Sequence, residues 1–217
     1  GFFASFYHLT GQIPHEADRR AAVQAAEAAR RVAEERDRRS AFLAKASQAL
    51  SGSLDVEVAV RRCAELLVPE ISPLAVVYLS DPDFGALDAC MALRHAGNPQ
   101  APMRTSWRPD DALPPALLGL LHRSTPARQR IGEDDLRQAL SDLGVHEPAL
   151  CWAMAVPLVA GERLLGTILV TAASAEFWAT PAAPLLDELA ACAATPFQNV
   201  RLYRVLQREM PERVAAQ

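Results

Sequence analysis

The amino-acid sequence predicts an α+β fold, in which helices cover a central antiparallel sheet and one long helix precedes it. Residues 15–51 contain neither glycine nor proline and are rich in Ala, Arg and Glu, which favour helix. Apolar segments of strand length gather in two groups, within 74–107 and within 151–170. Helical patterns occupy the ends and the middle of the chain and do not alternate with single strands. This order favours an antiparallel sheet over a doubly wound parallel one.

The composition is typical of a globular protein. The chain has 217 residues, of which 50% are apolar and 22% are charged, so we expect either one large domain or one medium domain with extensions. The net charge of −4 argues against a nucleic-acid partner, because proteins that bind nucleic acids normally carry an excess of basic residues. No apolar run approaches the ~20 residues of a membrane-spanning helix, so no membrane partner is expected.

The four cysteines indicate a reducing compartment. Cys63, Cys90, Cys151 and Cys192 are far apart and lie in apolar stretches. This pattern predicts buried thiols and argues against a disulfide framework. No signal peptide is visible, so we expect a cytoplasmic protein.

The first twelve residues, 1–12, read as a strand rich in Phe and Tyr that ends at a glycine turn. A lone strand needs partners at its edges, so we expect it to close an upstream domain. The chain also begins without Met, which indicates a piece of a longer protein.

Residues 13–39 are predicted to form a helix that pairs with a second copy of itself. An isolated helix of this length needs a partner surface to be stable. A heptad seam with 3-4 spacing is expected at the dimer interface, formed by Ala22, Ala25, Ala29, Val32 and Leu43. The seam positions Arg36 and Arg39 weaken this interpretation. The alternative is a solvated linker helix.

A globular domain is expected from residue 40, where the apolar density rises. Asp55 is placed to cap a helix that begins at Val56 and carries a regular apolar face. The strands predicted after this helix are 74–79, 89–95 and 103–107, followed by helices that begin at Pro115 and after Gly132. Strands 152–158 and 164–170 are then predicted to form a hairpin, and a long helix runs from about Pro181 past Tyr203.

Three segments resemble the GAF domains of bacterial signalling proteins, especially actinobacterial ones. They read FLAKASQALSGSLDVEVAVRRCAELLVPEISPLAVVYLSD, AVPLVAGERLLGTILVTAA and NVRLYRVLQRE, and the resemblance covers about residues 40–205. It implies terminal helices on one face of the sheet and middle helices over a pocket on the other. Within the second segment we expect Gly161 to form a turn and Gly166 to let its strand pass close to packed helices.

The flanking segments carry shorter resemblances. Residues 1–12 resemble the last strand of a PAS domain, and 13–39 then serve as a signalling helix. Residues 206–217 resemble a linker to an output domain that this chain lacks. In related architectures the output is a histidine kinase or a metal-dependent serine/threonine phosphatase.

The expected pocket is mostly apolar. Side chains alternate along a strand, and the small Ala153 and Ala155 suit close helix packing, so Trp152 and Met154 are assigned to the pocket face. The expected lining residues are Trp152, Met154, Trp107, Met91, Leu93, Leu118, Leu121 and His122. They predict a small apolar or mixed ligand of unknown identity, and no cofactor is assigned. The alternative is that these side chains fill a core without a ligand.

Signatures of catalysis are missing. The sequence has no GxxxxGK[ST], GxGxxG, HExxH or GxSxG motif, and its five histidines lack metal-ligand spacing. The acidic clusters at 110–111 and 133–135 precede predicted helices, so we interpret them as stabilising helix starts. The resemblance implies no covalent tetrapyrrole, because the middle region 109–150 has no cysteine, and the cyclic-nucleotide signature of the family has no counterpart here.

The sequence therefore predicts a non-catalytic sensory module that relays a signal, through dimeric flanking helices, to a kinase or phosphatase output domain. One alternative is a ligand-free dimerisation and scaffolding domain. Another is an enzyme like the methionine sulfoxide reductases of this family, although the four scattered cysteines show no matching catalytic pattern.

Overall fold

A computed structural model describes most of the chain. The described residues are 12–68, 70–80, 87–94, 103–107, 112–123, 129–146, 149–180 and 182–215. The predicted strand at 1–12 lies outside them except for Gln12, which begins a helix. The chain divides into two compact units, Gly1–Phe42 and Leu43–Gln217.

The long N-terminal helix is confirmed. Helix α1 runs from Gln12 to Ser51 without interruption, so it extends from the first unit into the second. In the first unit its side chains from Asp18 to Arg38 are all exposed. Arg30 Nε donates to Glu34 Oε1 at 2.7 Å, an exposed pair that contributes at most a few tenths of a kcal/mol.

The second unit has the predicted α+β architecture. Its described strands form one antiparallel sheet in the order β3-β2-β1-β6-β5-β4. The strands are β1 (Leu74–Ser80), β2 (Leu87–Arg94), β3 (Met103–Trp107), β4 (Gln129–Ile131), β5 (Trp152–Ala160) and β6 (Arg163–Ala172). The helices are α2 (Val56–Leu67), α3 (Pro115–Arg123), α4 (Glu133–Asp142), η1 (Ala175–Ala179) and α5 (Ala182–Ala215). The sequence did not predict β4 or η1.

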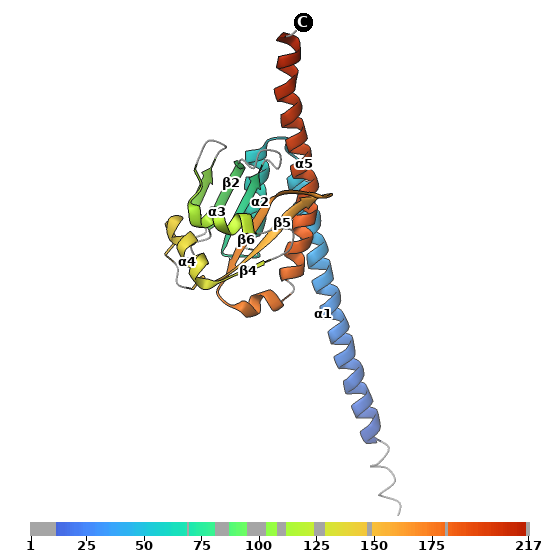
Figure 1. Ribbon diagram of the computed structural model, residues 1–217. Coiled ribbons are helices and arrows are strands. Elements are labelled where there is room, and N and C mark those ends of the chain that lie inside the picture. The colour runs from blue at the N-terminus through green and yellow to red at the C-terminus, as the bar shows by residue number, and fades with distance from the viewer. Residues whose placement is uncertain are drawn as a thin grey trace, which may run out of the picture. The chain divides into compact units, whose positions relative to one another are not determined.

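The helices lie on both faces of the sheet. Helices α3 and α4 cover one face, and α2 and α5 cover the other (Figure 1). The central strand β1 is buried on both sides: Leu74, Val76 and Tyr78 belong to the cluster under α3 and α4, and the alternate residues are buried on the α2 side. A strand buried on both faces reads as a continuous apolar run, as β1 does.

Local signals in the sequence account for the start of α2. The Asp55 side chain accepts a hydrogen bond from the backbone N–H of Val58 at 3.1 Å, as predicted for the cap. The apolar face of the helix is buried, with Cys63 and Leu67 fully enclosed.

The β5–β6 hairpin closes more tightly than the sequence indicated. Strand pairing continues to Ala160 and Arg163, so the loop has only two residues, Gly161 and Glu162. Gly161 has a φ of +63°, and no non-glycine residue in the described part of the chain has a positive φ. A positive φ at the first loop position alone is the pattern of a type II′ turn, which suits hairpins.

Gly166 lies against the backbone of β1, whereas the sequence predicted packed helices as its neighbours. A Cβ atom at Gly166 would lie 2.0 Å from the carbonyl oxygen of Tyr78 and 2.9 Å from Leu79 Cα. Both atoms belong to the backbone of β1, so the expectation that Gly166 accommodates packed helices is wrong. The glycine allows two central strands to approach each other.

Helix α4 ends in a Schellman motif. Gly144 has a φ of +70°, and the Val145 N–H donates to the Leu140 carbonyl at 2.8 Å. The Gly144 N–H donates to the Ser141 carbonyl at 2.9 Å. This motif turns the chain so that Val145 packs back beside Leu140 in the core.

Candidate functional site

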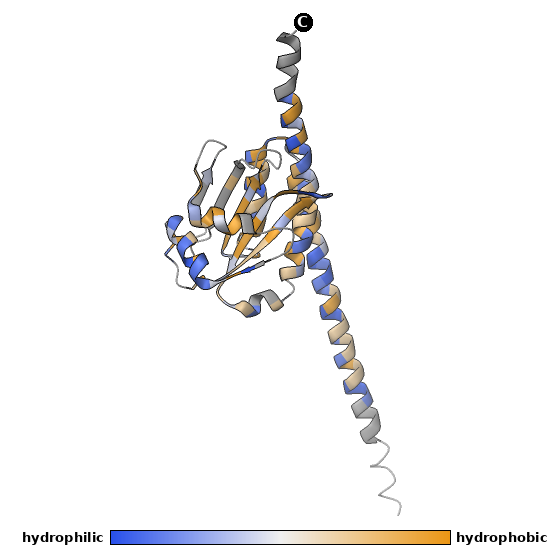
Figure 2. Cartoon of the chain, in the orientation of Figure 1, coloured by the Kyte–Doolittle hydropathy of each residue, from blue (hydrophilic) through white to orange (hydrophobic). Residues whose placement is uncertain are grey.

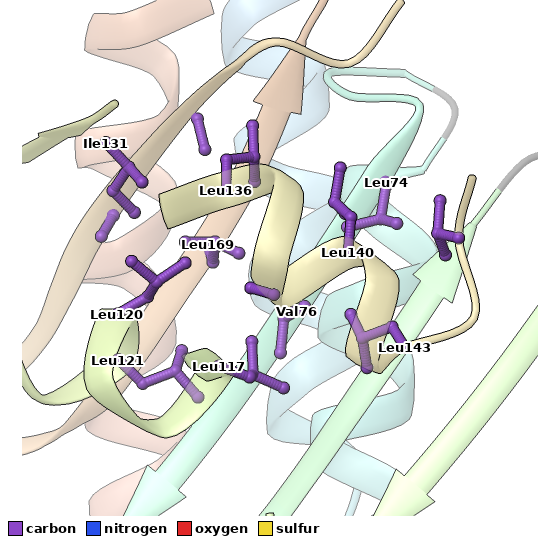
Figure 3. Packing of buried hydrophobic residues seen from close by; sticks show 14 of the residues in the cluster. Leu74, Val76, Leu117, Leu120, Leu121, Ile131, Leu136, Leu140, Leu143 and Leu169 are labelled. Carbon is purple, nitrogen blue, oxygen red and sulfur yellow. The ribbon is translucent and has the colours of Figure 1, made fainter. Parts of the chain in front are cut away.

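The face under α3 and α4, where the resemblance places a pocket, is packed with aliphatic side chains. They come from both helices and from the sheet (Figure 3). The residues labelled there are Leu74, Val76, Leu117, Leu120, Leu121, Ile131, Leu136, Leu140, Leu143 and Leu169. Leu117 and Leu136 have no exposed surface. This packing favours the alternative in which the described side chains form a core.

A polar contact fixes α3 on this face. Thr167 of β6 is 1% exposed, and its hydroxyl donates to the Leu121 carbonyl at 3.2 Å. Leu121 is in the last turn of α3, where carbonyls lack partners within the helix. Thr167 therefore satisfies one such carbonyl and joins the helix to the sheet.

The face assignment of β5 was wrong. Ala153 and Ala155 belong to the cluster under α3 and α4, and Ala155 pairs with Leu169 of the same cluster. Because side chains alternate, Trp152 and Met154 point to the opposite face. Met154 is buried at 2% exposure, and Trp152 is 37% exposed.

The other predicted lining residues are distributed unevenly. Trp107 packs against the cluster under α3 and α4, and Leu121 is part of it. Leu118 is half-buried on α3 and is not among the residues that pack there. The backbones of Met91, Leu93 and His122 lie in β2 and α3, but their side chains lie outside the described part of the structure.

An open cavity of about 430 Å³ lies beside α4. Its volume is within the range of small-molecule sites. It is lined by α4 and by the segment that leads into β5, through Glu133, Arg137, Leu140, Ser141, Val145, His146, Leu150 and Cys151. Cys151 and the acidic cluster that contains Glu133 stand out in the sequence, but neither was predicted to lie at a cavity. Gly144, which ends α4, is the signal in the sequence that could have indicated this cavity, because the turn it forms brings Val145 to the cavity wall.

The charged side chains at the rim of this cavity form ion pairs with one another. Arg137 donates to Glu133 and, at 3.1 Å, to Asp134. These groups are exposed, so each pair contributes little to stability. The acidic residues lie in the first turn of α4, where the helix dipole favours negative charge. No group of three potential metal ligands occurs among the described residues, and the cluster at 110–111 is outside them.

The four cysteines are free thiols in different environments. Cys63 and Cys90 are buried as predicted, whereas Cys151 and Cys192 are half-buried, which corrects the expectation for those two. Burial raises the pKa of Cys63 to about 12 and also raises the pKa of Cys90. Since the thiolate is the reactive form, both buried thiols are poor nucleophiles.

The raised pKa of Cys63 predicts a loss of stability at alkaline pH. At pH 8 and below the thiol is mostly protonated in both states, because its ordinary pKa is 9.0. Between pH 9 and 12 only the unfolded chain loses this proton, so unfolding becomes easier by up to ~1.4 kcal/mol per pH unit. Urea unfolding at pH 8 and pH 10.5 should show a smaller loss in Cys63→Ala than in the parent chain. Equal losses would contradict the burial of this thiol.

Exposed apolar side chains concentrate on the two flanking helices. Of the eight large hydrophobic residues exposed in the described part, Val23 and Val32 are on α1, and Leu202, Tyr203, Val205 and Leu206 are on α5. Figure 2 shows hydrophobic and hydrophilic residues interspersed along both helices. Val32 is 71% exposed and Leu206 is 60% exposed. The predicted seam residues Ala22, Ala25 and Ala29 are also exposed, and Leu43 is half-buried.

The described helices include none that is both long and apolar enough to span a lipid bilayer.

Among the comparisons with known proteins, the one with solved structures bears on the fold. No protein-family model and no curated protein matches the chain. Among solved structures, the GAF domain of a phosphoenolpyruvate-protein phosphotransferase from Coxiella burnetii is similar, with 15% identity and a TM-score of 0.51 over 77% of this chain and 96% of that one. The corresponding Acinetobacter domain has 12% identity and a TM-score of 0.48, over 76% and 96% of the two chains. The free methionine-R-sulfoxide reductase of Neisseria meningitidis has 15% identity and a TM-score of 0.49, over 75% and 89%. The similarity to the Coxiella domain shows that this chain has the fold of a GAF domain.

Proposed function

We propose that the chain is a non-catalytic regulatory module that relays a signal through paired flanking helices to an output domain. The observation that carries this proposal is the exposed apolar surface of the flanking helices, formed by Val32 on α1 and by Leu202, Val205 and Leu206 on α5. By the resemblance of the sequence, the output domain is a histidine kinase or a serine/threonine phosphatase.

The exposed residues of α5 are arranged as a binding face. Leu202 and Leu206 are four residues apart and Leu202 and Val205 are three apart, so they are neighbours on one side of the helix. They follow Phe197 and Val200, which are buried in the core. The helix thus changes from packing on its own domain to presenting apolar groups outward. Contiguous exposed apolar surface of this kind marks an interaction site.

A second copy of the chain is the partner that the spacing on α1 supports. The seam positions 22, 25, 29 and 32 repeat at 3 and 4 residues, as the facing positions of paired helices do. Farther along the same seam, Ala46 and Leu50 are fully buried within the second unit. The residues available for pairing therefore end before Ala46.

The chemistry of the described residues supports a module without its own reaction. The thiols of Cys63 and Cys90 are buried and held in the protonated form. The carboxylates of Glu133 and Asp134 are exposed and paired with Arg137. The relay would act as a shift between two arrangements of the paired helices, which any input that favours one arrangement can drive.

A dimerisation domain without a ligand is the second candidate function. The aliphatic packing under α3 and α4 favours it. A sensing module would instead hold its ligand in the cavity beside α4, where Leu140, Val145 and Leu150 provide apolar walls and Ser141 a hydrogen-bonding group. Native mass spectrometry of freshly purified protein distinguishes the two, because only the sensing module carries or takes up a small molecule there.

Light scattering tests the proposed dimer. The parent chain should have twice the protomer mass of 23.5 kDa. Val32→Asp places two carboxylates in the seam and should weaken association by about 100-fold or more, because the buried charges lack partners. Val23→Asp is the matched control. Val23 is also exposed, but it lies about two and a half turns before Val32 and therefore on the opposite side of the helix. Equal effects of the two substitutions would contradict the seam.

A further inference from the structure

The C-terminal turn of α1 lacks a charge of its own that would stabilise it. Helix α1 ends at Ser51 and has no basic residue in its last turn. The last carbonyls of any helix have no partner within the helix, and they form the negative end of its dipole. In the last two turns of α1, Ala46 and Leu50 are fully buried, so this end of the helix is packed within the second unit.

Arg62 of α2 provides the missing positive charge from outside the helix. Its Nη1 atom donates to the carbonyl oxygen of Ala49 at 2.9 Å, in a partly buried contact across 13 residues. A hydrogen bond from a charged donor is about twice as strong as a neutral one.

Gly52 leaves room for this contact. A Cβ atom at Gly52 would lie 3.0 Å from Arg62 Nη1 and 3.6 Å from the Gln48 carbonyl. The guanidinium group therefore passes directly beside the residue that follows the helix end. Asp55, which caps α2, is only three residues further on, so the link joins two helices across a short turn.

Helix α2 carries the connection onward to the sheet. Its buried face, which includes Val60, Cys63 and Leu67, packs against β1 and β2. Strand β1 has its other face in the cluster under α3 and α4. One continuous series of packed elements thus leads from that cluster, through β1 and α2, to the end of α1.

We infer that Arg62 is a positioning residue that couples the sheet to α1, by holding the last turn of α1 on α2. The significance of this coupling for signal relay rests on the proposed function. Rearrangement of the sheet face displaces α2 and Arg62 together. The Ala49 carbonyl then loses its donor, and the last turn of α1 loosens.

Hydrogen exchange with mass spectrometry tests the inference. Arg62→Met keeps the apolar stem but removes the donor, and should accelerate amide exchange in residues 46–51 about 10-fold, with exchange in the core part of α5 unchanged. Arg62→Lys should restore part of the protection, because a charged donor returns. The control is Arg61→Met, which alters the exposed neighbour on the same helix and should leave residues 46–51 as in the parent.

Unchanged exchange at 46–51 in Arg62→Met would overturn the coupling. So would an equal acceleration across α1, α2 and α5, because that result indicates general destabilisation. The mass from light scattering on the same samples separates this question from the proposed function. A monomeric parent chain contradicts the dimeric relay, whereas a dimer with unchanged exchange contradicts only the role of Arg62.

Discussion

Gly166→Ala is expected to lower the free energy of unfolding by about 3 kcal/mol or more, a large part of the stability of a domain of this size. The added Cβ would meet the Tyr78 carbonyl oxygen at 2.0 Å, a distance that real structures do not tolerate. The obstacle is the backbone of a central strand and not the end of a flexible side chain. Strands β1 and β6 would have to separate at the point where Leu79 pairs with Gly166.

Gly119→Ala provides a matched control with the opposite sign. Gly119 is exposed on α3, and a Cβ atom there would meet nothing within 4 Å. Alanine in a helix is favoured over glycine by roughly 0.5–1 kcal/mol, so this variant should be slightly more stable than the parent. Urea unfolding followed by circular dichroism measures both. A Gly166→Ala variant as stable as the parent would contradict the close approach of the two strands.

The parts of the fold that the sequence predicted are those that local chemistry determines. The start of α2 is predictable from Asp55, because the capping hydrogen bond reaches only three residues along the chain, to Val58. Gly161 marks a hairpin turn because it adopts a positive φ that other residues avoid. The continuous apolar run of β1 predicts a strand buried on both sides.

The face of β5 was not predictable from alternation alone. Both of its faces are buried, so the strand carries no polar side to identify the outer one. The deciding factor is volume, because the leucine-rich helices α3 and α4 fill the space above Ala153 and Ala155. Small side chains here match large ones on the opposing helices. The leucines of α3 and α4 are therefore the signal in the sequence that identifies the face of β5 on which the small side chains lie.

The elements that were missed depend on tertiary contacts. Strand β4 has three residues, Gln129–Ile131, too few for an alternating pattern, and it is defined by its pairing with β5. The Arg62 link joins residues 13 positions apart. Neither spacing nor residue type identifies such a contact before the chain is folded.

We propose that α1 pairs with α1 of a second copy through the seam that contains Val32. In a parallel pair, each seam residue faces its own equivalent across the twofold axis. A disulfide forms only where the two Cα atoms approach to about 4.4–6.8 Å. A cysteine introduced at a seam position should therefore link two chains, whereas one on the opposite side of the helix should not.

Oxidative cross-linking of Val32→Cys tests this claim most directly. Val23→Cys is the control, because both positions are exposed valines on α1 but lie on opposite sides of the helix. The unaltered chain, with Cys151 and Cys192 half-buried, gives the background. On a non-reducing gel, Val32→Cys should migrate at twice 23.5 kDa, whereas Val23→Cys and the parent should remain at 23.5 kDa. A monomeric Val32→Cys band, or equal cross-linking at both positions, would contradict this pairing.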